Sequence, residues 1–271
     1  MNESPDKNNI PALQEAASIL ALTFVAMLGT ALLLGTFTND MLSRPFIVII
    51  ELVIVLPALY HAHKNNYDIA ATFRLRAINR DTLLASILIG VSLTIAGEEI
   101  GRLMELILPV PEEYREMYTS QFQANSAADW FFLILGVVIV AGIAEEMVFR
   151  GFFQRSAEAH LDVTRGVLLT AFVFSLLHMS TYSIVQIVLL GMFLGVMAWR
   201  SQSVIPAIIA HAINNGVSLI LINMEPENML ALEWHGHLNP LLVLLSVAGL
   251  VTGFSWLYRA TEPGTATRHP D

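Results

Sequence analysis

Long apolar runs follow one another along most of the chain, separated by short polar segments. A helix needs roughly 20 mostly apolar residues to cross a bilayer. Eight runs come near that length, at 13–37, 46–63, 82–108, 129–154, 164–179, 182–200, 203–222 and 238–258. The fifth and sixth runs are short, so a single broken hairpin is an alternative interpretation of that pair. The pattern predicts an all-α fold, a polytopic bundle of about eight transmembrane helices.

Composition supports a membrane protein. Hydrophobic residues make up 55% of the 271 residues and charged residues 14%, whereas soluble domains carry about 25% charged residues. No soluble domain fits between the runs, so we expect a single integral membrane domain over residues 1–271. The N-terminal segment lacks the basic region and short apolar core of a cleaved signal, and its first apolar run is expected to stay as an anchor. The absence of cysteine excludes disulfides and thiolate chemistry.

Basic residues occupy alternate loops. They follow the second, fourth, sixth and eighth runs, at Lys64, Arg74, Arg76, Arg80, Arg155, Arg165, Arg200, Arg259 and Arg268. Because basic loops stay in the cytoplasm, we expect both termini to be cytoplasmic in a plasma-membrane protein, with Arg44 as the one exception. Basic and apolar positions alternate over 67–80 in the manner of an interfacial helix. The net charge of −9 argues against nucleic-acid binding and leaves the lipid bilayer as the expected surrounding.

One apolar run ends in G-I-A-E-E-M-V-F-R-G, at residues 142–151. Ionisable groups inside a bilayer are costly and usually mark a functional site. Glu146 and Arg150 are four residues apart, so they pair on one helix face. Glu145 points about 100° away from Glu146 and has no local cation. A poorly paired, desolvated carboxylate is suited to take a proton from water.

Two later runs carry further polar groups. F-V-F-S-L-L-H at 172–178 places Phe174 one turn before His178, and H-A-I-N-N at 211–215 places His211 and Asn215 on one face. A glutamate and a histidine can hold and deprotonate water, while a second histidine and an amide can donate to a tetrahedral oxyanion. These groups predict amide hydrolysis without a covalent nucleophile. Their different depths along the helices indicate a polar cavity that faces the cytoplasm.

The three motifs resemble those of a known family. E-E-M-V-F-R, F-S-L-L-H and H-A-I-N-N are similar to the EExxxR, FxxxH and HxxxN motifs of the CAAX protease and bacteriocin-processing (CPBP/ABI) family. The resemblance covers roughly residues 80–222, which would form the catalytic core. It implies a membrane-embedded endopeptidase of the glutamate type, which acts on a peptide or membrane-protein substrate.

The resemblance also implies a role for each motif residue. Glu145 would be the catalytic base, and His178 would position the same water. His211 and Asn215 would form the oxyanion hole, and Glu146, Arg150 and Phe174 would support the site. The mechanism implied is metal-free, with no cofactor. Nothing in the sequence indicates a site for a prenyl group.

Several alternatives stay open. The same fold can use zinc, with Glu145, His178 and His211 as ligands and water in the fourth position. A non-catalytic immunity, scaffold or chaperone protein would keep the polar cavity for binding. A proton-coupled transporter fits less well, since a proton relay has little need of Asn215. Structurally, the glutamates can end a span near the interface, and membrane histidines often only join helices by hydrogen bonds.

A second glutamate pair lies in I-A-G-E-E-I-G-R, where Arg102 comes one residue too early for the EExxxR spacing. Glu98 and Glu99 are four and three residues before Arg102, so we expect mutual neutralisation on one helix face. This polar seam would pack inside the bundle, line the cavity or contact substrate. His235 and His237 fall in a loop and are expected to be solvated.

Overall fold

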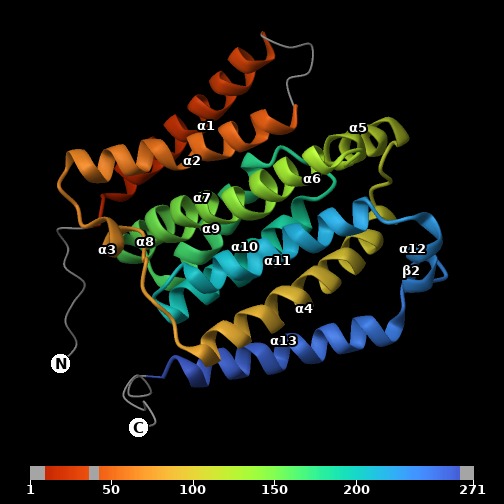
Figure 1. The fold of residues 1–271 in the computed structure, drawn as a ribbon. Coiled ribbons are helices and arrows are strands. Elements are labelled where there is room, and N and C mark those ends of the chain that lie inside the picture. Colours follow the sequence, from red (N-terminus) through yellow and green to blue (C-terminus); the bar gives the residue numbers. More distant parts are fainter. Residues whose placement is uncertain (1–9, 37–42, 263–271) are drawn as a thin grey trace.

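The structure is a computed structural model that describes residues 10–36 and 43–262. The described chain is almost entirely helical (Figure 1). Its long uninterrupted helices are α1 (Leu13–Gly35), α2 (Arg44–Lys64), α4 (Arg80–Glu105), α9 (Val163–Leu177), α10 (Ile184–Ser201), α11 (Ile205–Ile222) and α13 (Pro240–Ala260). Shorter elements are α3 (Ile69–Thr72), α5 (Glu112–Phe122), α12 (Pro226–Leu232) and the hairpin of β1 (Glu233–Trp234) and β2 (His237–Leu238).

Each of the eight predicted apolar runs contains helix, which confirms the all-α membrane bundle. Within the described residues, seven helices are long and apolar enough to cross a membrane. The fifth run differs, because α9 has 15 residues, a rise of about 22 Å, which is less than the thickness of a typical hydrocarbon core. It ends at Leu177, and Met179 then takes a left-handed conformation with φ 50°. Eight full spans therefore stay a prediction.

The fourth run forms one continuous helix with two wider segments. It runs through α6 (Ala127–Leu133), the π-helix η2 (Ile134–Val140), α7 (Ala141–Glu146), the π-helix η3 (Met147–Phe153) and α8 (Gln154–His160). The amide Nδ2 of Asn215 donates to the Val137 carbonyl at 2.9 Å. Arg74 donates to the Arg150 carbonyl at 3.4 Å. Such wide turns are rare and occur often at functional sites, and here they flank the two glutamates.

The continuous helix lies in the middle of the bundle (Figure 1). It packs against α2 and α1 on one side and against α11, α10 and α9 on the other, and α4 and α13 lie beyond α11. Small residues allow the closest approaches. A Cβ atom added at Gly90 of α4 would lie 2.9 Å from the Ala210 Cα of α11, and one at Gly191 would lie 3.0 Å from the Ala171 Cα.

The predicted interfacial helix over 67–80 is wrong apart from the single turn α3. Residues 65–79 form instead a connecting strap whose backbone bonds to other elements. The Arg74 carbonyl accepts from Val204 N at 3.0 Å, and the Arg76 carbonyl accepts from Ser203 Oγ at 2.6 Å. Arg74 has a φ of 53°, which interrupts any helix. Amphipathic spacing was present, but the strap's polar groups bond to the bundle.

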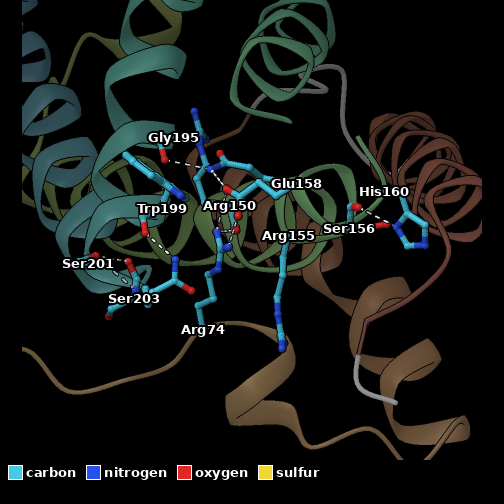
Figure 2. A network of polar contacts seen from close by, with 12 residues as sticks. Arg74, Arg150, Arg155, Ser156, Glu158, His160, Gly195, Trp199, Ser201 and Ser203 are labelled. Carbon is cyan, nitrogen blue, oxygen red and sulfur yellow. Dashed lines mark hydrogen bonds and ion pairs between the residues drawn. The ribbon is translucent and has the colours of Figure 1, made fainter. Parts of the chain in front are cut away.

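A buried ion pair fastens the strap to α8. The guanidinium of Arg74 pairs with the carboxylate of Glu158, and their side chains are 7% and 9% exposed. Gln154 donates to Glu158 at 2.7 Å and to the Gly195 carbonyl of α10 at 2.9 Å. Figure 2 shows this network between the strap, the end of the continuous helix and α10. The strap also receives a hydrogen bond from Arg155 at the Ala71 carbonyl.

The same end of the bundle collects the predicted basic loops. The strap contacts the loop between α10 and α11, and Asn79 donates to the Ala260 carbonyl at the end of α13 at 3.0 Å. Arg200 donates to the Tyr258 carbonyl at 2.8 Å. The alternate loops therefore meet in space as the charge pattern indicates. Their assignment to the cytoplasm stays a prediction.

Arg44, the exception to the charge pattern, has a structural partner. Its guanidinium donates to the carbonyls of Ser120 at 2.9 Å and Gln123 at 2.7 Å, at the end of α5. A cation is favoured at the C-terminal end of a helix, where the last carbonyls lack intrahelical partners. Arg44 therefore holds α5 to the start of α2.

In the second glutamate pair, Glu98 lies close enough to Arg102 to interact electrostatically, whereas Glu99 is engaged differently from the expected mutual neutralisation. Glu99 lies 2.8 Å from His237 Nδ1 and accepts from Leu238 N at 2.8 Å. Arg102 pairs with Glu233 at 2.8 Å. The polar seam of α4 thus fastens the β1–β2 hairpin, and His237, whose side chain is 37% exposed, is partly solvated as well as bonded to Glu99.

We expect the Arg74→Met variant to be destabilised by about 3 kcal/mol, because loss of one partner leaves a buried, uncompensated carboxylate on Glu158. Thermal unfolding in detergent measures this change. The matched control is Arg76→Met, since the Arg76 side chain is exposed and only its backbone carbonyl bonds to Ser203. Equal unfolding temperatures for the two variants would contradict the proposed role of the ion pair.

Candidate functional site

The centre of the site is a fully buried ion pair on the continuous helix. Arg150 Nη1 donates to Glu146 Oε1 at 2.7 Å, and both side chains are 0% exposed. The second guanidinium nitrogen donates to the Gly191 carbonyl of α10 at 3.3 Å. This geometry confirms the pairing predicted from the four-residue spacing. The Arg150 guanidinium also joins the continuous helix to α10, and a charged group at this depth in a membrane needs such partners.

His211 connects this pair to α11. Its Nδ1 atom lies 2.9 Å from Glu146 Oε1, and its Nε2 atom lies 3.8 Å from Glu145 Oε2. An ionised carboxylate only accepts hydrogen bonds, so Nδ1 carries the proton in this contact. Glu146 therefore fixes the orientation of the ring, and the other nitrogen is directed toward Glu145.

Glu145 forms no ion pair with a cation of its own helix among the described residues, although Arg150 lies near enough to interact with it electrostatically. Its side chain is almost buried, and its Oε2 atom has no hydrogen-bond partner among the described groups. Buried polar atoms are nearly always satisfied by protein or water. The unpaired oxygen therefore marks a place for a water molecule or a substrate group.

Phe174 brings the second motif to the site. Its ring is fully buried and lies beneath the Arg150 guanidinium, with Cζ 4.2 Å from the ring centroid. The same ring lies 4.6 Å from the ring of His178 and 5.9 Å from that of His211. A cation above an aromatic face is attractive, more so when water is excluded. One aromatic side chain thus contacts residues of all three motifs.

His178 lies farther out than the other motif residues. It caps the end of α9, is exposed, and its Nδ1 atom lies 2.9 Å from the Phe174 carbonyl. Because a carbonyl only accepts, Nδ1–H is the donor and Nε2 is left to accept a hydrogen bond when the ring is neutral. Within the described residues, no hydrogen bond or ion pair joins His178 to Glu145. Its role in positioning water stays a prediction.

Asn215 lies one turn beyond His211 on α11 and is half-buried. One of its two N–H groups is directed to the Val137 carbonyl in η2, at 2.9 Å. Asn214 donates to the Asn215 side-chain oxygen at 3.3 Å. The wide turn of η2 therefore fixes the amide, and a second N–H group is left for an oxyanion. This role also stays a prediction.

Sequence reasoning missed one carboxylate near the site. Glu51 lies in α2, and its Oε2 atom is buried without a hydrogen-bond partner. Its carboxylate lies close enough to Glu145 for the two to interact electrostatically. A signal was present, because Glu51 is the only acidic residue in the apolar run 46–63. It was not recognised because no motif surrounds it.

The described residues do not assemble the alternative zinc ligands. No group of three or more histidine, aspartate or glutamate side chains lies together there in a way that could hold a metal ion. Glu145 and His211 offer two donors, whereas catalytic zinc takes three protein ligands, and His178 lies apart from them. The structure thus identifies no ligand set, and metal dependence stays untested.

The predicted cytoplasm-facing cavity also stays a prediction. Two shallow pockets lie elsewhere: one is formed by the ends of the strap, α10 and α13, and the other by the starts of α2 and α6. The site is a packed polar cluster. Within it, the Oε2 atom of Glu145 is buried without a hydrogen-bond partner and can accept a hydrogen bond from a water molecule or a substrate group.

Comparison with known proteins supports the motif resemblance. Residues 127–217 match the family model described as type II CAAX prenyl endopeptidase Rce1-like. The matched segment contains all three motifs, from Glu145 to Asn215, and covers about one third of the chain. Neither the curated proteins nor the solved structures gave a match. The match confirms the predicted resemblance and supports a membrane endopeptidase.

The buried ion pair makes a prediction for stability. We expect Arg150→Met to lower the free energy of unfolding by about 4 kcal/mol, because Glu146 is left as a buried charge. Combining it with Glu146→Gln should recover part of that loss, since the second change removes the uncompensated charge. Chemical unfolding in detergent gives both values. Arg165→Met is the control, because the pair of Arg165 with Asp162 is exposed; a purely additive double variant would contradict the coupling.

Proposed function

We propose that the protein, whose residues 127–217 match the Rce1-like type II CAAX prenyl endopeptidases, is an intramembrane endopeptidase that activates water with Glu145. The observation that supports this most is the buried Glu145 oxygen that has no partner and faces His211 Nε2 at 3.8 Å. A carboxylate in such a position is a general base that lacks only its water. The catalytic core would lie within residues 80–222.

The reaction would begin with a water held at the Glu145 carboxylate. Glu145 takes one proton from the water, and the oxygen bonds to the carbonyl carbon of the scissile peptide. His178 is proposed to orient the same water, because its Nε2 atom is left to accept a hydrogen bond. Glu145 then gives the proton to the amide nitrogen as the carbon–nitrogen bond breaks, so the carboxylate is regenerated.

The oxyanion formed by this attack needs hydrogen-bond donors. His211 is proposed to supply one through Nε2, which faces Glu145 at 3.8 Å and donates when both ring nitrogens carry a proton. Asn215 would supply the second through the N–H group that does not bond to Val137. Donors that are fixed before the reaction stabilise the transition state most. Arg150 and Phe174 would act by holding Glu146 and the two rings in place.

Replacement of the base gives the direct test. We expect Glu145→Gln to lower peptide cleavage by about 1,000-fold, because a general base contributes 100- to 10,000-fold. Peptides released in membranes that contain the wild-type protein or the variant are compared by mass spectrometry. Glu98→Gln is the matched control, a partly buried glutamate of α4 outside the cluster. Unchanged products from Glu145→Gln would exclude the mechanism.

The metal alternative has its own test. Under the proposed mechanism, chelation of divalent metals should leave cleavage by the wild-type protein unchanged. The same release of peptides is measured before and after chelator treatment and after addition of zinc. Activity that is lost on chelation and restored by zinc would favour the zinc-dependent protease.

A further inference from the structure

Glu51 is an acidic residue within an apolar helix, where an ionised side chain costs free energy. It is the seventh residue after Arg44 at the start of α2, about 10 Å along the helix. Its neighbours in sequence are isoleucine and leucine, and α2 has no other acidic residue. A carboxylate at such a depth is rare unless a cation or a function retains it.

The described residues offer Glu51 no cation. The helix α2 packs against α1, α3, α6, η2, α7 and η3. Arg150 of η3 is bound to Glu146, Asp129 of α6 lies by Arg44, and Glu15 of α1 is acidic. The titratable group that acts on Glu51 electrostatically is Glu145, a second carboxylate. Both have an unpaired, buried Oε2 atom.

The charges of the cluster indicate which form Glu51 takes. Three carboxylates, Glu51, Glu145 and Glu146, share this region with Arg150 and His211. When His211 is protonated, two cations balance two anions, and an uncompensated third anion would be costly in an apolar surrounding. Glu145 and Glu146 are the carboxylates near these cations, with His211 between them. The third carboxyl group, that of Glu51, therefore holds a proton.

We propose that Glu51 is a positioning residue of the active site, a neutral carboxyl group on α2 that donates its proton in a hydrogen bond toward Glu145. This proposal rests on the proposed function for its effect on catalysis. The hydrogen bond would hold the Glu145 carboxylate with one oxygen toward the water, and no proton is consumed. Glu51 lies outside the segment 127–217 that matches the endopeptidase family.

The kinetic test compares two replacements at this position. We expect Glu51→Leu to lower kcat by roughly 10- to 100-fold with little change in KM, because a misplaced base costs rate rather than substrate binding. Glu51→Gln should recover most of that loss, since its amide donates a similar hydrogen bond. On a Glu145→Gln background, Glu51→Leu should add no further loss. Wild-type kcat in Glu51→Leu, or equal losses in the leucine and glutamine variants, would overturn the proposal.

A second measurement does not depend on activity. The infrared absorption of protonated carboxyl groups is recorded for the wild-type protein and for Glu51→Gln at neutral pH. We expect the variant to lose part of this band, whereas the control Glu105→Gln, which removes a partly exposed carboxylate paired with Arg115, keeps it. An unchanged band in Glu51→Gln would overturn the proposal. If no cleavage is found for the wild-type protein, the proposed function fails, and the infrared result still decides the state of Glu51.

Discussion

The interaction on which the site depends is the buried contact of Glu146 with both Arg150 and His211. Its Oε1 atom lies 2.7 Å from the guanidinium and 2.9 Å from the imidazole. A lone charge of either sign would be costly at this depth, so each partner requires the other. Because Arg150 also reaches α10 at Gly191, one carboxylate fixes the relation of three helices. Orientation of His211 toward Glu145 follows from that arrangement.

The helix that carries this carboxylate is itself unusual. The π-helical segments η2 and η3 enclose α7, so the turn with the two glutamates is wound differently from its surroundings. Side chains from elsewhere, Asn215 and Arg74, bond to carbonyls in these segments. The strap of residues 65–79 is thereby linked to the site helix through Arg74, which also pairs with Glu158. The geometry of the glutamates and the anchoring of a distant loop are thus parts of one polar network.

Local sequence predicted what depends on spacing within one helix. The Glu146–Arg150 pair, the separate direction of Glu145 and the apolar helices all follow from a period of 3.6 residues and from the cost of charge in a bilayer. Contacts between distant segments were not predictable in this way. The strap looked like an amphipathic helix because its basic spacing does not reveal the buried partner, Glu158. The binding of Glu99 and Arg102 to the β1–β2 hairpin could likewise not be predicted, because it depends on the position of the hairpin beside α4.

Glu51 illustrates the same limit at the site itself. A single carboxylate in an apolar run forms no sequence motif. Its relation to the site is seen only in the structure, where α2 packs against α7. That packing turns a pair of glutamates on one helix into three carboxylates that share their region with one guanidinium and one imidazole. In water an excess of carboxylates over cations would cost little free energy. In an apolar surrounding an unpaired charge is costly, so the charge balance determines which carboxyl group is protonated. The site is therefore best understood as a group of charges balanced across α2, the continuous helix and α11.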